Sequence, residues 1–389
     1  MEGTLVEWFA SWTVGVFLLL LGLCVGSFLN VCIYRLPAGK SIIWPASHCT
    51  SCQTPIAWYD NIPVASYLVL GGKCRGCGAP FSARYMLVEL ATGLVWFWYW
   101  AVYFKTGLRP GADHPGVYLS HMVLASALLV SGLIDLDRKE IYTSVTNVAL
   151  AVGVAASVAW PDIQRLGAYD HVLPNWTGWG RVDAPILALV GAAVGAGLIN
   201  LTRFLGTLAF RREAMGAGDV YLMALIGGIL GWEAALLVFL VAPFLGLPYG
   251  IWQVLRQKKE AQAEAAGDKG EKPVPVEVNY GTFVATVIGL ACFLAAAWMG
   301  RPEWCTPARL LLVGGLAAMG VSFFFLAREE SGDAEPAESD AQPAPESDSH
   351  EVPYGPFLGL AAGVVMLIQE YAVGHFGPGI EALLHAIAG

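Results

Sequence analysis

Long apolar runs recur along most of this chain, and they constrain its fold more than any other feature. A helix needs about 20 apolar residues to cross the roughly 30 Å hydrocarbon core of a membrane. We expect such spans near residues 14–34, 86–104, 117–136, 144–160, 184–202, 219–231, 234–252, 282–299, 309–327 and 356–374. Only 14% of the residues are charged, whereas a soluble domain is about a quarter charged. The sequence therefore predicts an all-α, polytopic integral membrane protein with about eight to ten transmembrane helices.

The basic residues indicate which ends of these spans face the cytoplasm. With the N-terminus outside, sixteen of the 22 Lys and Arg residues fall on the inner side, in agreement with the positive-inside rule. The first 13 residues carry two Glu and no Lys or Arg, so we expect 14–34 to stay as a first transmembrane helix rather than act as a signal peptide. Residues 35–85 and 253–281 would then be cytoplasmic loops. A miscounted span would reverse the orientation of everything after it.

The net charge of −9 has a local origin. Residues 329–351 contain nine acidic residues and no Lys or Arg, among many Pro, Ala and Ser. This composition is typical of a disordered linker, which we assign to 328–352. The linker separates two extra transmembrane helices, 282–327, from a final helix and tail, 353–389. The sequence contains no basic patch with interleaved aromatic residues, so nothing in it indicates a nucleic-acid partner.

The polar loop 35–85 contains the pairs Cys49-x-x-Cys52 and Cys74-x-x-Cys77. Two such pairs at this separation are typical of a structural zinc site with four thiolate ligands and no open position for catalysis. Disulfides or a redox pair are the alternatives, but a loop on the basic, cytoplasmic side lies in a reducing compartment. We expect the other four cysteines to be ordinary apolar residues. Arg84 and Glu89, at the end of the loop, are expected to form a salt bridge within it.

Two carboxylates stand at the inner ends of apolar runs. Asp135 ends the run 117–136, and Asp219 follows Gly216-Ala217-Gly218 at the start of another. Ionisable residues at a membrane boundary are costly and often functional. A pair at one depth could share a proton, activate water and stabilise an oxyanion, as in aspartic proteases. Asp135 could instead neutralise the positive charge of the basic residues that follow it, and Asp219 could be the N-cap of a helix. Asp137 is a weaker rival to Asp135, since it lies closer to water.

Several stretches resemble the type 4 prepilin leader peptidase/N-methyltransferase family of bacteria. Asp135, six residues before Ile141, resembles the first catalytic aspartate of that family, and Gly216 to Asp219 resembles its GxGD motif with the second. Three positions depart from the family pattern, namely Met86, Tyr142 and Tyr221, where Pro, Pro and Lys are usual. The remaining similar stretches are Gly26 to Pro37, the cysteine loop with Asn61 to Pro63 and Ser82 to Tyr85, and Tyr354 to Leu358.

The resemblance implies an inner-membrane enzyme with two activities. Its peptidase core, 86–252, would use Asp135 and Asp219 to cleave type IV prepilins and type II secretion pseudopilins after a glycine at the cytoplasmic face. The cysteine loop would belong to the methyltransferase region, which transfers a methyl group from S-adenosylmethionine to the new N-terminus. No motif places the S-adenosylmethionine site. Membrane lipid would surround the spans. A peptidase without methyltransferase activity, a proton- or ion-coupled transporter and a zinc-stabilised membrane scaffold are the alternative interpretations.

Overall fold

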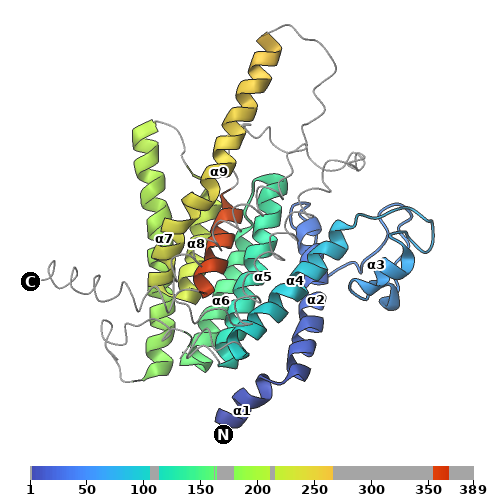
Figure 1. The fold of residues 1–389 in the computed structure, drawn as a ribbon, viewed down its shortest axis with the longest axis horizontal. Helices are drawn as coiled ribbons and strands as arrows, with labels where there is room; N and C mark the ends of the chain where they lie inside the picture. Colours follow the sequence, from blue (N-terminus) through green and yellow to red (C-terminus); the bar gives the residue numbers. More distant parts are fainter. Residues whose placement is uncertain are drawn as a thin grey trace, which may run out of the picture. The chain divides into compact units, whose positions relative to one another are not determined.

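In a computed structural model, the described residues are 2–105, 114–161, 163, 179–210, 215–265 and 354–367. They form helices and, within those ranges, no strand; the only β-type contacts there are isolated bridges between His48 and Pro55 and between Lys73 and Pro80. The prediction of an all-α membrane fold is therefore confirmed. The helices are α1 Glu2–Phe9, α2 Trp12–Arg35, the 3-10 helix η1 Trp58–Asn61, α3 Ala65–Leu70, α4 Arg84–Phe104, α5 Pro115–Arg138, α6 Thr143–Ala159, α7 Gly180–Phe210, α8 Ala217–Leu230, α9 Trp232–Ala265 and a final helix, Gly355–Leu367 (Figure 1).

Within the described ranges, four helices are long and apolar enough to cross a membrane, judged by length and composition: α2, α4, α5 and the segment Gly180–Leu208 of α7. Shorter apolar helices are Thr143–Ala159, Ala217–Leu230, Trp232–Leu247 and Gly355–Leu367. Each of these eight begins within a few residues of an expected span. The two extra spans, 282–327, and the acidic linker, 328–352, lie outside the described residues. Helix α9 continues to Ala265, into the stretch that the sequence indicated as a polar loop.

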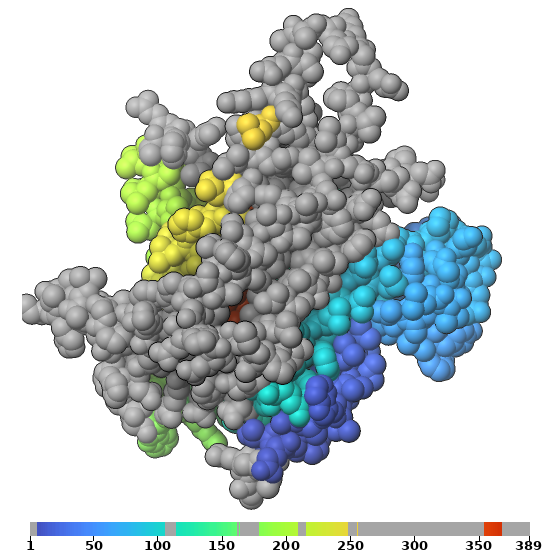
Figure 2. All heavy atoms as spheres, in the orientation of Figure 1, coloured from blue at the N-terminus to red at the C-terminus, as the bar shows by residue number. Residues whose placement is uncertain are grey.

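The chain divides into two compact units, and the first contains α2, α3, α4 and the loop that joins them. Helices α2 and α4 pack antiparallel. Gly22 and Gly26 let the two helices come close, since a Cβ on Gly26 would lie 2.6 Å from the Cα of Glu89. Further along, the Asn30 side chain donates a hydrogen bond to the Tyr85 carbonyl at 2.8 Å. The cysteine loop leaves the helix pair at this end, and its side chains form a compact mass (Figure 2, light blue).

The second unit contains α5 to α8, the start of α9 and the final helix. Helix α8 lies in the core of this unit, since Leu222, Met223, Leu225 and Ile226 are all 0% exposed. Helix α7 crosses α8 at glycines, where a side chain on Gly191 would collide with the Gly227 carbonyl. The final helix lies beside α5 (red in Figure 1), with the Gly359 backbone next to Leu128. This packing brings the start of the final helix, which is far away in the sequence, next to the end of α5.

Candidate functional site

Asp135 occupies the last turn of α5. The helix ends at Lys139, which adopts the left-handed conformation with φ of 55° and donates its backbone N–H to the Asp135 carbonyl at 2.8 Å. Only 5% of the Asp135 surface is exposed, and the preceding residues Leu133 and Ile134 are 1% exposed. The apolar face of α5 therefore carries this carboxylate into the protein rather than leaving it in solvent.

A backbone amide from the far end of the chain reaches this carboxylate. The Gly355 N–H donates to Oδ2 of Asp135 at 3.0 Å, across 220 residues of sequence. A Cβ at position 355 would lie 2.8 Å from Oδ2 and 3.3 Å from Cγ of Asp135. Real Cβ atoms do not approach an oxygen this closely, so glycine lets the start of the final helix lie directly against Asp135. Sequence reasoning identified Tyr354 to Leu358 as a similar stretch but missed this contact.

Asp219 lies in the first turn of α8, which begins after the N-cap residue Gly216. It is 6% exposed, and its position at a helix N-terminus favours a negative charge. Gly218 beside it packs on Ile141, where an added Cβ would lie 2.6 Å from the Ile141 Cβ. The small residue before Asp219 thus allows α8 to start against the segment that joins α5 to α6.

One side chain, that of Ile141, connects the surroundings of the two carboxylates. Ile141 borders Gly218, which precedes Asp219, and Gly355, whose amide binds Asp135. Burial, followed by the nearby charge of Asp219, raises the pKa of the Tyr354 phenol to about 12, so this hydroxyl stays protonated. Two carboxyl groups that repel each other in a buried place favour holding a single proton between them. Such a pair can supply a base and an acid at once.

The other residues singled out in this region lie at its edge. Asp137 is half-buried, two residues beyond Asp135 and on another side of the helix. The Tyr142 hydroxyl donates to Glu140 at 2.8 Å. Tyr221 is 43% exposed, and nothing in the structure explains the tyrosine at this position.

The four loop cysteines converge on one point. Their sulfur atoms all lie within 4.8 Å of one another, with Sγ–Sγ distances of 3.8 Å between Cys49 and Cys77 and 3.9 Å between Cys52 and Cys74. Sulfur ligands of a tetrahedral zinc ion with bonds near 2.3 Å lie about 3.8 Å apart, whereas disulfide sulfurs lie about 2.05 Å apart. The cluster therefore could hold a zinc ion, and its geometry does not fit two disulfides.

Both cysteine pairs use the same backbone turn. The N–H of Cys49 donates to the Thr54 carbonyl at 3.0 Å, and the N–H of Cys74 donates to the Ala79 carbonyl at 2.8 Å. The residue after the second cysteine is left-handed in each turn, with φ of 58° at Gln53 and 74° at Gly78. This repeated turn points all four thiols to one side, as a single metal ion requires.

The salt bridge expected between Arg84 and Glu89 does not form. Glu89 instead accepts the backbone N–H of Val64 at 2.8 Å, and the Ser27 side chain lies beside its carboxylate. The ion pair that does form in the described part of the loop joins Arg75 and Asp60. Glu89 does not pair with Arg84 because its side chain points toward α2 and the backbone that precedes α3.

Comparison with known proteins agrees with this arrangement. Residues 20–103 match the family model described as the bacterial peptidase A24 N-terminal domain, and residues 122–251 match the type IV leader peptidase family. A prepilin leader peptidase/N-methyltransferase from Myxococcus xanthus is 41% identical over 259 residues, which cover 65% of this chain and 69% of that protein. A protein of the same description from Klebsiella pneumoniae is 34% identical over 57% of this chain and 86% of its own length.

A type 4 prepilin-like proteins leader peptide-processing enzyme from Escherichia coli is 32% identical over 59% of this chain and 82% of its own length. No solved structure matches the chain. The two matched regions contain the cysteine cluster and both buried aspartates, respectively. The chain therefore belongs to the prepilin leader peptidase/N-methyltransferase family.

Proposed function

We propose that this protein removes the leader peptide from type IV prepilins and then methylates the new N-terminal amine. The observation that carries the proposal is that Asp135 on α5 and Asp219 on α8 are both buried, beside glycines that pack on the same side chain, Ile141. The names of its relatives support the same pair of activities. Type II secretion pseudopilins, which present a similar leader and apolar stem, are proposed as further substrates.

In the proposed cleavage, one carboxylate of the pair takes a proton from water while that water attacks the peptide carbonyl. The protonated carboxyl donates a hydrogen bond to the oxygen on which negative charge develops. The Gly355 amide holds Oδ2 of Asp135 in place during this step. A second proton transfer to the departing amine completes hydrolysis without a covalent intermediate.

The proposed setting is the cytoplasmic face of the bacterial inner membrane, in a multi-pass protein. Arg138 and Lys139 lie two and three residues beyond Leu136, the last apolar residue of α5, which supports an inward-facing site. A prepilin has a polar leader and an apolar helical stem, so its scissile bond, after a glycine, would lie at this boundary. Membrane lipid would contact the outer faces of the helices.

We assign two non-protein groups to the N-terminal region. Cys49, Cys52, Cys74 and Cys77 are proposed to bind a structural zinc ion, because their sulfur separations suit a tetrahedral thiolate site. S-adenosylmethionine is proposed as the source of the methyl group. The zinc-binding turns would hold the walls of the methyltransferase region in a fixed shape.

The test is reconstitution of the purified full-length protein with a purified prepilin, followed by mass spectrometry of the pilin. We expect loss of the leader, and a further gain of one methyl group when S-adenosylmethionine is added. A pilin that keeps its leader would contradict the proposal. A cleaved pilin that is never methylated would reduce the function to that of a peptidase.

A further inference from the structure

A large cavity lies inside the first unit, between α2, α4 and the cysteine loop. Its volume is about 1120 Å³, above the roughly 300–1,000 Å³ typical of small-molecule sites. None of the residues that line it comes from α5 or α8, so the two aspartates take no part in it. It lies beside the proposed zinc turns, since Cys49 and Cys74 are among its lining residues.

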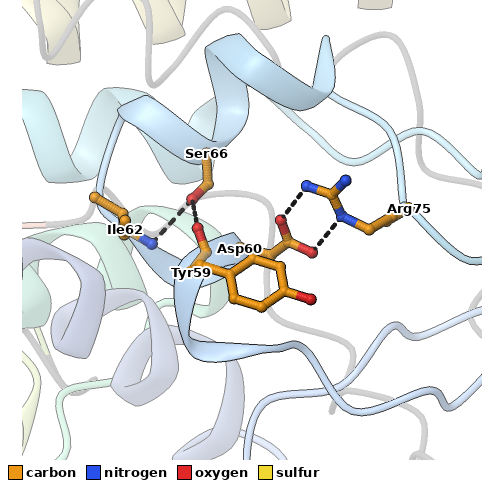
Figure 3. Close-up of polar contacts among 5 residues, drawn as sticks. All are labelled: Tyr59, Asp60, Ile62, Ser66 and Arg75. Atoms are coloured by element: carbon orange, nitrogen blue, oxygen red, sulfur yellow. Dashed lines mark hydrogen bonds and ion pairs between the residues drawn. The ribbon is translucent and has the colours of Figure 1, made fainter.

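One wall of the cavity is fixed by short polar contacts (Figure 3). The Ser66 hydroxyl accepts the Ile62 N–H at 2.9 Å and donates to the Tyr59 carbonyl at 3.2 Å. Arg75 forms a two-point ion pair with Asp60 at 2.6 and 2.7 Å, and this pairing holds the pKa of the Asp60 carboxyl below its usual range. These two charges are therefore matched to each other and are not available to a ligand.

Arg35, in contrast, lines the cavity without an acidic partner. It is the last residue of α2 and is only 7% exposed. Its guanidinium donates to the Ser41 carbonyl at 3.0 Å, and no carboxylate of the described residues lies in ion-pair range. A buried cation with unused donors is costly unless an anion completes it. A planar carboxylate suits a guanidinium best, since it can accept two parallel hydrogen bonds.

Glu89 is the complementary unmatched charge. It is half-buried, lines the same cavity, and accepts the Val64 N–H, but no cation of the described residues pairs with it. Ser27, which lies beside Glu89, precedes Arg35 by eight residues on α2, or about 12 Å along the helix axis. The two charges are therefore held near points about two turns apart along α2, which suits the two ends of one elongated ligand.

Aromatic side chains also line the cavity. Tyr34, Trp44 and Tyr59 line the cavity and are 47%, 76% and 49% exposed. Lys40 lies over one face of the Tyr34 ring and Arg75 over one face of the Tyr59 ring. The exposed Trp44 ring and the remaining ring faces offer stacking surfaces for a flat, heterocyclic ring. The cavity thus combines a site for a carboxylate, a strong acceptor and a stacking surface.

We propose that this cavity binds S-adenosylmethionine. Arg35 pairs with the carboxylate of its amino-acid end, the Glu89 carboxylate accepts the ribose hydroxyls, and the aromatic side chains cover the adenine. The assignment rests on the methyltransferase part of the proposed function, and it gives that activity a place in the first unit.

The test uses equilibrium binding to the full-length protein in detergent, measured by titration calorimetry. The probes are S-adenosylhomocysteine, which has no methyl group to transfer, and methylthioadenosine, which keeps the nucleoside but lacks the amino-acid end. We expect Arg35→Gln to weaken S-adenosylhomocysteine about tenfold or more, because it removes a charged hydrogen bond, and to leave methylthioadenosine unchanged. Glu89→Gln should weaken both probes.

Lys73→Gln is the matched control, because Lys73 is an exposed cation of the same loop that does not line the cavity. It should bind both probes like the parent protein. Equal binding of S-adenosylhomocysteine by the parent and by both cavity variants would overturn the assignment while leaving the methyltransferase function intact. Equal weakening of both probes by Arg35→Gln would overturn the role of Arg35. A parent protein that neither binds S-adenosylhomocysteine nor methylates pilin would overturn the methyltransferase proposal itself.

Discussion

The backbone amide of Gly355 holds the carboxylate of Asp135 at 3.0 Å. The final helix is therefore part of the candidate active site, although 220 residues separate the two groups in the sequence. The donor is the backbone N–H, which almost any residue at position 355 would supply. Glycine matters there because it has no side chain to collide with the Asp135 carboxylate. This relationship ties the geometry of Asp135 to a segment outside the region matched by the peptidase model.

A first prediction follows for Gly355→Ala. The new methyl group would lie about 2.8 Å from the Asp135 Oδ2, so the carboxylate or the helix must move. A displacement on the order of 1 Å can reduce catalysis about 100-fold, and we expect a loss of leader cleavage of that order. Gly359→Ala is the control, because a methyl group there would meet Leu128 at ordinary contact distances of 3.7–3.9 Å. Parent-like cleavage by Gly355→Ala would show that the close contact between Gly355 and Asp135 is not needed for leader cleavage.

Gly218→Ala tests the placement of Asp219. The added methyl group would lie 2.6 Å from the Ile141 Cβ, and α8 would have to shift its first turn, with Asp219 in it. We expect cleavage to fall at least about tenfold while the helical circular dichroism signal is kept. Gly197→Ala, in open space on α7, should be tolerated. If the two alanine variants cleave prepilin equally well, the close packing of Gly218 on Ile141 has no functional role.

The zinc proposal predicts a metal content that depends on each loop cysteine. Cys49→Ser or Cys74→Ser should abolish stoichiometric zinc in the purified protein, because both are ligands of the tetrahedral site. Cys24→Ser is the control, since Cys24 lies in α2 outside the cluster. The measurement is elemental analysis of protein purified without chelator. Full zinc content in either ligand variant would contradict the site.

The sequence singled out candidate site residues but not the contacts that hold them. Asp135, Asp219 and the four cysteines were recognisable because each interrupts its surroundings: a charge in an apolar run, or paired thiols in a polar loop. The Gly355 contact was not predictable, because every residue except proline has a backbone N–H and the sequence does not show which one meets Asp135. Glu89 was misassigned to a loop salt bridge because sequence proximity to Arg84 does not show which way a helical side chain points.

Helix α9 runs further than the span that the sequence indicated. Its last residues, Arg256 to Ala265, include no large apolar side chain, and a polar stretch at the end of an apolar span suggested a loop. They are nevertheless mostly Ala, Gln, Glu, Lys and Arg, which are strong helix formers with no Gly or Pro among them. The helix therefore continues beyond the apolar segment that ends near Leu247.

The central claim is that Asp135 and Asp219 act together in leader cleavage. Asparagine keeps the volume of aspartate and can still accept the Gly355 N–H, but it cannot ionise or share a proton. Asp137→Asn removes a neighbouring, half-buried carboxylate in the same way and serves as the matched control. All three variants should keep the parental helical content.

The direct measurement is the initial rate of leader removal from a purified prepilin by the parent protein and these three variants. We predict no detectable product from Asp135→Asn or Asp219→Asn and a parent-like rate from Asp137→Asn. Cleavage near the parental rate by either of the first two variants would contradict the two-carboxylate mechanism.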